Sequence, residues 1–149
     1  MKKSIFTILI VIAAIALTSC GKSIDYELPA DATAFNTGTF INPDNKDDTY
    51  QSIEYGGRTY IPYGTLKKGI DSDDTGRCLG YKVQDGEEMK QIRLFLLRAD
   101  KENNYIVEID TEGFMSQPIF LRASDTVGKE IITPDYIESL EYEYWKKSP

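Results

Sequence analysis

Short segments of alternating apolar residues, separated by turn signals, constrain the fold of this chain more than any other feature. The most apolar pair is residues 77–84 and 89–98, separated by Asp85-Gly86-Glu87-Glu88, which predicts a hairpin with a turn of two or four residues. The two registers differ by an even shift, so both place the same side chains on one face. That predicted core face carries Leu79, Tyr81, Val83, Ile92 and Leu94.

A second hairpin is predicted from Gln51–Tyr55 and Arg58–Pro62, which flank Gly56-Gly57. Two glycines suit a tight turn in which both central residues need a positive φ. The expected cross-strand pairs are Tyr55 with Arg58 and Ile53 with Tyr60.

Two further strands are predicted at Asn104–Asp110 and Pro118–Arg122, and Thr133-Pro134-Asp135 has the pattern of a helix start. The residues after it fit either a helical stripe or an alternating strand, and we expect one helical turn followed by a final strand. The predicted fold is therefore mainly β: an antiparallel meander of about five to seven strands, curled or barrel-like, with at most one short C-terminal helix. An α+β fold is the alternative.

The first twenty residues have the layout of a secretory leader. After Met1-Lys2-Lys3, residues 5–17 are apolar apart from Thr7, a run too short to span a membrane comfortably, which takes about 20 residues. The run ends in Leu17-Thr18-Ser19-Cys20, which resembles the lipobox of bacterial lipoproteins. The resemblance implies a lipoprotein signal peptide at residues 1–19, acylation of Cys20 as the first mature residue, and a lipid-anchored chain on the cell membrane, facing outside the cytoplasm. A cysteine that merely ends an N-terminal membrane anchor is the alternative.

Residues 20–49 are polar and rich in turn-forming residues, which predicts a lipid-anchored tether with one short strand at Thr39–Ile41 docked on the domain. Their large aliphatic and phenyl side chains, among them Leu28, Phe35, Phe40 and Ile41, are too few for a core. A flexible chain of about 25 residues reaches roughly 25–30 Å, enough to lift a domain clear of the headgroups. A single β-rich domain is then expected at residues 50–149.

Charge and missing residue types exclude several functions. The chain has 17 basic and 24 acidic residues, and loss of Lys2 and Lys3 with the leader leaves 15 against 24, or −9. This balance disfavours nucleic acid, whose binding relies on Lys and Arg at phosphates. The chain has no histidine, which excludes Ser-His-Asp and Cys-His nucleophiles and the common His-containing zinc sites. Once Cys20 is acylated, Cys78 is a lone thiol, expected to be buried in a strand.

Carboxylates offer two weak patterns. Residues 71–76 begin like a calcium loop, but Lys82 occupies the twelfth position, where a bidentate Glu is needed, so a solvated turn is the better interpretation. Glu54, Asp73 and Glu108 lie on segments that could meet as a hydrolytic pair, although nothing singles out two of them. We expect no metal and no cofactor.

Aromatic residues are the feature most like a binding surface. The chain has ten tyrosines and one tryptophan, gathered at the first hairpin and at the C-terminus. Cross-strand packing of tyrosine rings is the ordinary explanation. The surface expected to bind is Tyr142, Tyr144 and Trp145, beside Glu141 and Glu143. We therefore expect a non-catalytic binding, immunity-like or accessory module with a protein or glycan partner at the cell surface. The alternative is a small carboxylate-based hydrolase acting on cell-envelope polymers.

One further resemblance covers roughly residues 50–122. It rests on Tyr55-Gly-Gly-Arg-Thr-Tyr60, Tyr63-Gly64, Cys78-Leu-Gly-Tyr81, Tyr105-Ile-Val-Glu108 and Gly113-Phe-Met115. Their order resembles a group of small lipoproteins of Gram-positive gut bacteria. The resemblance implies the same compartment and carries over no activity.

Overall fold

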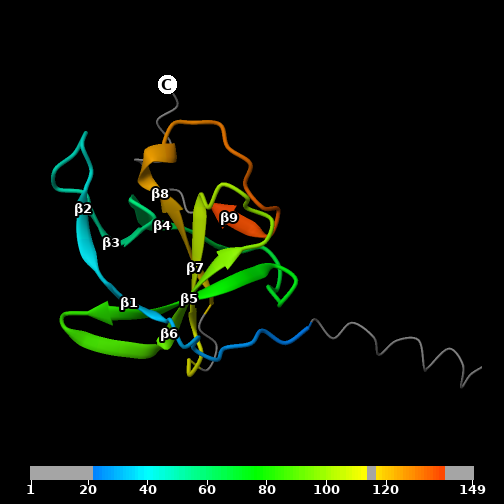
Figure 1. Ribbon diagram of the computed structural model, residues 1–149. Coiled ribbons are helices and arrows are strands. Elements are labelled where there is room, and N and C mark those ends of the chain that lie inside the picture. The colour runs from blue at the N-terminus through cyan, green and yellow to red at the C-terminus, as the bar shows by residue number, and fades with distance from the viewer. Residues whose placement is uncertain (1–21, 114–116, 140–149) are drawn as a thin grey trace, which may run out of the picture.

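A single curled sheet dominates the structure, a computed structural model that describes residues 22–113 and 117–139 (Figure 1). Its strands are β1 (Thr33–Asn36), β2 (Gly38–Ile41), β3 (Thr49–Tyr55), β4 (Arg58–Leu66), β5 (Thr75–Gln84), β6 (Glu87–Leu97), β7 (Tyr105–Asp110), β8 (Ile119–Ala123) and β9 (Ile137–Ser139). Their order in the sheet is β1-β5-β6-β7-β8-β4-β3-β2, and β9 pairs with β4. The mainly β, barrel-like fold predicted from the sequence is confirmed, with more strands than the five to seven expected.

One continuous segment joins the two ends of this strand order. β1 pairs in parallel with β5, β2 pairs antiparallel with β3, and only Thr37 separates β1 from β2. The backbone N–H of Thr37 donates to the carbonyl of Val83 at 2.8 Å, which holds the crossing point against β5. Residues 33–41 therefore bring the two edges of the sheet together and nearly close the barrel; we call them the closing segment.

The closing segment corrects the expected domain boundary. Thr39–Ile41 was predicted as a short docked strand, and it is the greater part of β2. The rest of residues 20–49 was expected to be a tether, yet Phe35 and Ile24 are buried in the protein interior. The folded unit therefore begins well before Tyr50, because β1 and β2 supply pairing that the sheet edges otherwise lack.

Both predicted hairpins are present. Tyr55 pairs with Arg58 and Ile53 with Tyr60, around Gly56 and Gly57 at φ 59° and 77°. In the second hairpin Gln84 pairs with Glu87, so the turn closes over the two residues Asp85 and Gly86, both at positive φ. The sequence left a four-residue closure open, and the structure selects the shorter one.

The face predicted for the second hairpin is only partly correct. Leu79 and Val83 are buried as expected, but Tyr81 lies opposite Arg93 rather than among the core residues. The reason is a set of register shifts between β5 and β6, one of them immediately after Tyr81. A bulge changes which side chains share a face, so alternation counted from the turn fails beyond it.

The C-terminal part of the described chain differs from the helix expected at Thr133. The Ile137 N–H donates to the Pro134 carbonyl at 3.0 Å, which closes a single turn, and the strand β9 follows at once. The alternating residues 140–144, on which the final strand was predicted, lie outside the described residues. Thr133 does not cap a helix, because its hydroxyl lies 2.6 Å from the Tyr105 hydroxyl. Within the described ranges the one helical element is the 3₁₀ turn η1 (Ser124–Thr126).

The sheet separates two hydrophobic clusters. The inner cluster fills the barrel and contains Phe35, Ile53, Tyr60, Leu79, Leu94, Ile106, Leu121 and Ala123. The outer cluster lies on the opposite face of the sheet and contains Ile24, Tyr63, Phe95, Leu97, Tyr105, Val107, Ile109, Phe120, Tyr136 and Ile137. Alternate residues of β7 enter each cluster, so this strand is buried on both faces.

Candidate functional site

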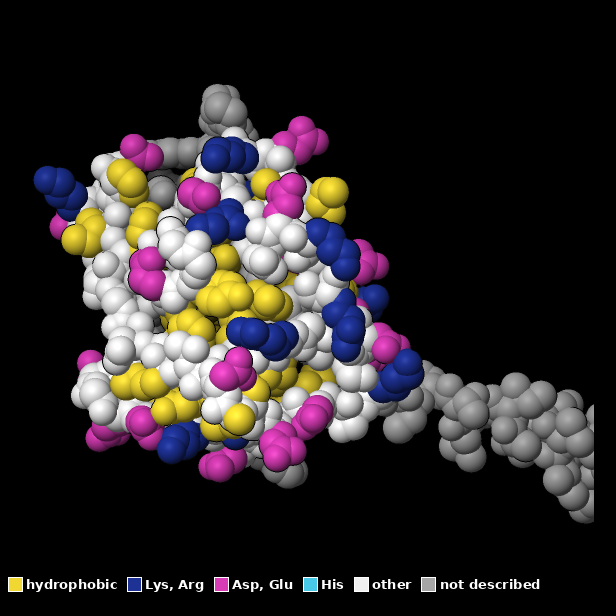
Figure 2. All heavy atoms as spheres, in the orientation of Figure 1, with side chains coloured by type: hydrophobic (Ala, Val, Ile, Leu, Met, Phe, Trp, Pro, Cys, Tyr) yellow, Lys and Arg dark blue, Asp and Glu magenta, His cyan; other side chains and the backbone are white. Residues whose placement is uncertain are grey.

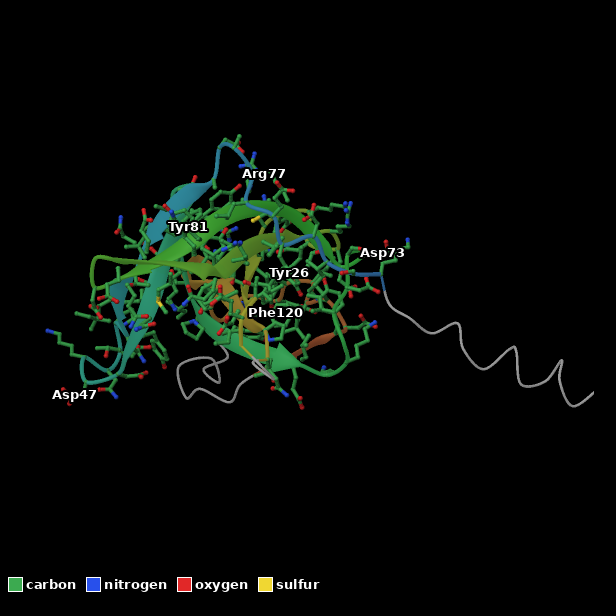
Figure 3. The ribbon with its side chains drawn as sticks, turned by 90° about the horizontal axis from the view of Figure 1, so that it is seen from below. Tyr26, Asp47, Asp73, Arg77, Tyr81 and Phe120 are labelled. Carbon is green, nitrogen blue, oxygen red and sulfur yellow. The ribbon has the colours of Figure 1, made fainter. Side chains whose placement is uncertain are left out.

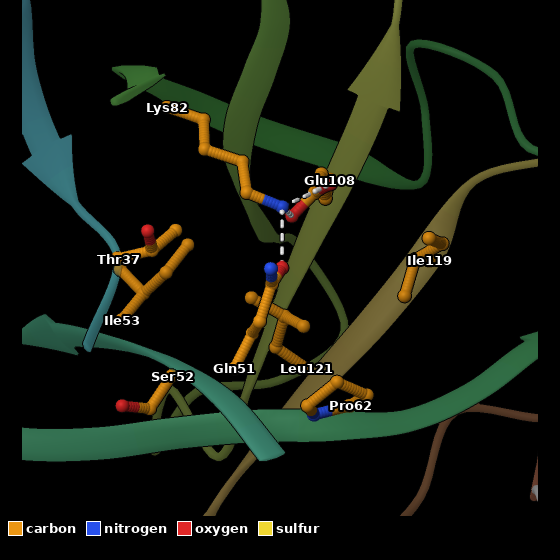
Figure 4. A pocket seen from close by; sticks show the side chains of 9 residues that line it. All are labelled: Thr37, Gln51, Ser52, Ile53, Pro62, Lys82, Glu108, Ile119 and Leu121. Carbon is orange, nitrogen blue, oxygen red and sulfur yellow. Dashed lines mark hydrogen bonds and ion pairs between the residues drawn. The ribbon is translucent and has the colours of Figure 1, made fainter. Parts of the chain in front are cut away.

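A break in the sheet between β3 and β4 leads into the barrel. The β3–β4 ladder runs from the turn to the pair Ile53 and Tyr60 and then stops. By the alternation of an antiparallel ladder, the next inter-strand donor of β4 would be Pro62, which has no N–H. The sequence thus ends the pairing at this point, and the two strands separate around a small pocket (Figure 4).

The pocket has a cavity volume of about 70 Å³. Its lining is Thr37, Gln51, Ser52, Ile53, Pro62, Lys82, Glu108, Ile119 and Leu121. These residues come from β3, β4, β5, β7, β8 and the crossing point of the closing segment. Pockets for drug-sized molecules are commonly about 300–1,000 Å³, so this cavity has room for a few water molecules only.

A nearly buried ion pair occupies the pocket. The Lys82 amino group donates to both Glu108 carboxylate oxygens, at 3.1 and 3.2 Å, and lies 3.4 Å from the Gln51 side-chain oxygen (Figure 4). Each charged side chain is only 11% exposed. Because an unpaired buried charge is strongly unfavourable, each of the two makes the other tolerable in the barrel. Through the Gln51 contact, the pair links β5 and β7 to β3. These strands lie on both sides of the closing segment.

Sequence reasoning missed this pair. Lys82 was considered only as the residue that spoils a calcium loop, and Glu108 only as one member of a possible carboxylate pair. The available signal was confined to Glu108, which lies between the apolar residues Val107 and Ile109 on β7, whereas alternation on β5 placed Lys82 on the face opposite Leu79 and Val83. A lysine and a glutamate so placed can be matched only once the strand order is known.

The structure does not bring the three suspected carboxylates together as a catalytic pair. Glu54 accepts from the Thr59 hydroxyl on the neighbouring strand, Asp73 pairs with Lys22, and Glu108 pairs with Lys82. Each carboxylate thus has a different partner. The geometry offers no arrangement of these three that resembles two carboxylates flanking a glycosidic bond.

The loop at residues 71–76 is organised by its own backbone. The Asp71 side chain accepts from the Asp73 N–H at 2.7 Å, and its carbonyl accepts from the N–H groups of Asp74 and Thr75, both at 3.1 Å. Such bonds are typical of an Asx turn. Over the part of the chain that the structure describes, no group of three or more His, Cys, Asp or Glu residues is placed to hold a metal ion.

Cys78 lies on β5, as predicted, and is half-buried against the outer cluster. Burial raises the pKa of its thiol, which keeps the group protonated at neutral pH. The thiol borders a shallow surface groove of about 420 Å³, between residues 25–30 and β5. A second groove of the same volume lies on the other side of this N-terminal segment, against Leu66 and Ile70.

Tyrosines of the first hairpin pack rather than project. Tyr60 is buried in the inner cluster and its hydroxyl donates to the Asn103 carbonyl at 2.6 Å. Tyr63 packs against Tyr105 in the outer cluster, with the two rings tilted by 59°. The expected binding residues Tyr142, Tyr144 and Trp145, and the lipid-attachment residue Cys20, lie outside the described residues. On the face shown in Figure 2, basic and acidic side chains are interspersed around a central strip of hydrophobic ones.

Comparison with known proteins found no matching family model, no matching curated protein and no matching solved structure. Among the described residues, no helix is long and apolar enough to cross a bilayer.

Proposed function

We propose that this chain is a lipid-anchored, extracytoplasmic binding module that catalyses no reaction. The observation that carries the proposal is the filled barrel. Its interior is occupied by packed side chains and its mouth by the Lys82–Glu108 pair, which leaves about 70 Å³. A molecule of substrate size therefore has no room inside, and recognition has to use the outer surface.

The anchoring part of the proposal rests on Leu17-Thr18-Ser19-Cys20. Acylation at Cys20 would hold the domain at the membrane, and two acyl chains suffice for stable anchoring where one is marginal. Mass spectrometry of the mature protein should find Cys20 as its first residue, carrying acyl chains. The variant Cys20→Ala should lose both the processing and the membrane association.

The binding part rests on the C-terminal aromatic residues. Tyr142, Tyr144 and Trp145 stand among acidic residues, a combination that suits a protein or glycan partner at the cell surface. Anchoring raises the local concentration of the two partners, so a modest affinity is sufficient. The hydrolase alternative gains no support, because Glu54, Asp73 and Glu108 each contact a different partner.

The test is chemical crosslinking in native membranes, followed by affinity capture of the anchored protein. Trp145→Ala should weaken association by about 2 kcal/mol or more, as expected of an interface hot spot. The matched control is Tyr81→Ala, which removes a half-exposed aromatic ring whose hydroxyl contacts Glu88. A thermal melt of Trp145→Ala decides the interpretation: a strongly lowered melting temperature assigns the residue to the core and removes it from the binding surface.

A further inference from the structure

We propose that the anchored domain lies directly against the lipid headgroups, through the end of the barrel formed by Lys22 and residues 67–74. We call this end the membrane-proximal end. The proposal rests on the acylation of Cys20 proposed above, and it replaces the flexible tether expected from the sequence. It names a bilayer as the partner of one surface and leaves the opposite end of the barrel for other molecules.

The chain is fixed to the domain from Lys22 onward. The Lys22 carbonyl accepts from the Ser72 N–H at 3.2 Å, and its amino group pairs with the Asp73 carboxylate at 3.0 Å. Both partners belong to the loop between β4 and β5. The point at which the chain enters the domain is therefore beside this loop, as Figure 3 shows at Asp73.

The residues after Lys22 are held as well. Ile24 is 9% exposed and packs in the outer cluster. The Tyr26 carbonyl accepts from the Arg93 guanidinium at 3.0 Å, and the Tyr26 ring meets the Phe95 ring edge-on. Buried apolar contact and a hydrogen bond to β6 distinguish this segment from a flexible linker, which makes neither.

The remaining length of chain is very short. Cys20 is two residues before Lys22, and an extended chain spans at most about 3.3–3.6 Å per residue, so the two Cα atoms are separated by at most about 7 Å. The polar headgroup layer of one leaflet is roughly 5–7 Å thick, from the difference between whole-bilayer and hydrocarbon thickness. A chain whose acyl groups lie in the hydrocarbon thus reaches Lys22 at about the outer surface of the headgroups.

The charges of this end fit a zwitterionic surface. Three amino groups are balanced by three carboxylates along Lys22 and residues 67–74: Lys22, Lys67, Lys68, Asp71, Asp73 and Asp74. Two of these, Lys22 and Asp73, already pair with each other. With no excess of positive charge, this end gains little from anionic lipids, so the acyl chains must supply the affinity.

The opposite end of the barrel then points away from the bilayer. Asp47, in the loop between β2 and β3, lies at the far side of the molecule from Asp73 (Figure 3). The turn between β5 and β6 is directed to the same side as that loop in Figures 1 and 3. These two turns are the part of the described surface most accessible to molecules approaching from outside.

The experiment compares the two ends in acylated, full-length protein reconstituted into phosphatidylcholine vesicles. A fluorophore is attached at Lys68→Cys or at Asp47→Cys, both in a Cys78→Ser background, and is quenched by a nitroxide on the lipid headgroup. We expect quenching at position 68 to exceed that at position 47 by about fivefold, because only the first lies near the headgroup layer. Equal quenching at the two positions overturns the proposal.

A linker variant provides the matched control. Ten Gly and Ser residues inserted between Gly21 and Lys22 add a root-mean-square reach of about 17 Å and should remove most of the difference between the two positions. A difference that persists unchanged would overturn the role of the short connection. Mass spectrometry of the same sample separates the two proposals. Absence of acyl chains on Cys20 overturns the anchoring and this inference with it, whereas an acylated protein with equal quenching overturns this inference alone.

Discussion

The inner and outer clusters are enclosed in different ways. Every residue of the inner cluster lies on a barrel strand, and the sheet itself shields that cluster from water. The outer cluster instead takes residues from segments without strand structure, such as Ile24 and Tyr136, and Ile70 and Ile131 pack against it. The comparison teaches that the barrel alone does not complete this fold: residues 22–30, 67–70 and 131–136 are also needed, to cover the outer face of β6, β7 and β8.

The largest effect is expected from a residue of the outer cluster. Phe120 is fully buried there, and Phe120→Ala should lower the free energy of unfolding by about 4 kcal/mol through lost burial and the cavity left behind. Its neighbour Ile119 is 40% exposed, so Ile119→Ala should change stability by about 0.5 kcal/mol or less. Chemical denaturation measures both. Similar values for the two variants would show that the outer cluster is not a true core.

The next largest loss of stability is expected from the Lys82–Glu108 ion pair, beside the inner cluster. Glu108→Ala leaves the Lys82 amino group buried without a counter-charge and should cost about 3 kcal/mol of unfolding free energy. The double variant Lys82→Met with Glu108→Leu removes both charges and should return stability to within about 1 kcal/mol of wild type. A double variant as unstable as the single one would mean that the ion pair has a specific role in closing the barrel.

Closure of the barrel depends on Gly80. Its φ is 148°, and an added Cβ would overlap the backbone of Thr33 on β1. Gly80→Ala should destabilise the protein by about 2 kcal/mol and speed hydrogen exchange in β1. Gly86 is the matched control, because it also has a positive φ but open space around it. If Gly80→Ala loses no more stability than Gly86→Ala, backbone strain alone explains the loss, and overlap with Thr33 contributes nothing.

The N-terminal segment should give a smaller effect. Ile24 is 9% exposed in the outer cluster, so Ile24→Ala should cost about 1.5 kcal/mol. Limited proteolysis is the sharper measurement, since the variant should be cut within residues 22–30 sooner than wild type. The closing segment, residues 33–41, should resist cleavage in both proteins. Rapid cutting of wild type throughout residues 22–49 would restore the tether expected from the sequence.

The smallest effect concerns Cys78, which packs on the outer cluster. Burial raises the pKa of its thiol, so the reactive thiolate is scarce at neutral pH and increases only as the pH rises toward that pKa. A thiol reagent should label the native protein slowly at pH 7, faster at higher pH, and fastest in denaturant. Equal rates in native and denatured protein would place the thiol outside the packed structure.

The sequence predicted local pairing well and distant pairing poorly. The pairs around Gly56-Gly57 follow from turn chemistry, and the strands at β7 and β8 follow from alternation. The parallel pairing of β1 with β5 joins residues more than 40 positions apart and carries no local signal. Tyr81 was misplaced because bulges between β5 and β6 shift the register, and the Lys82–Glu108 site was missed because its partners meet only through the sheet.

What the sequence determined by itself is the strands from β3 to β8 and their tight turns, since side-chain alternation and the φ preferences of glycine act over a few residues. The acylation site at Cys20 is also a prediction of sequence alone. Tertiary structure decided the rest: whether residues 33–41 form a tether or close the barrel, and which charges share the interior. This short segment has only Phe35, Phe40 and Ile41 as large apolar side chains, too few to fold alone. It becomes structured because it pairs with two open sheet edges and because Phe35 is buried in the interior.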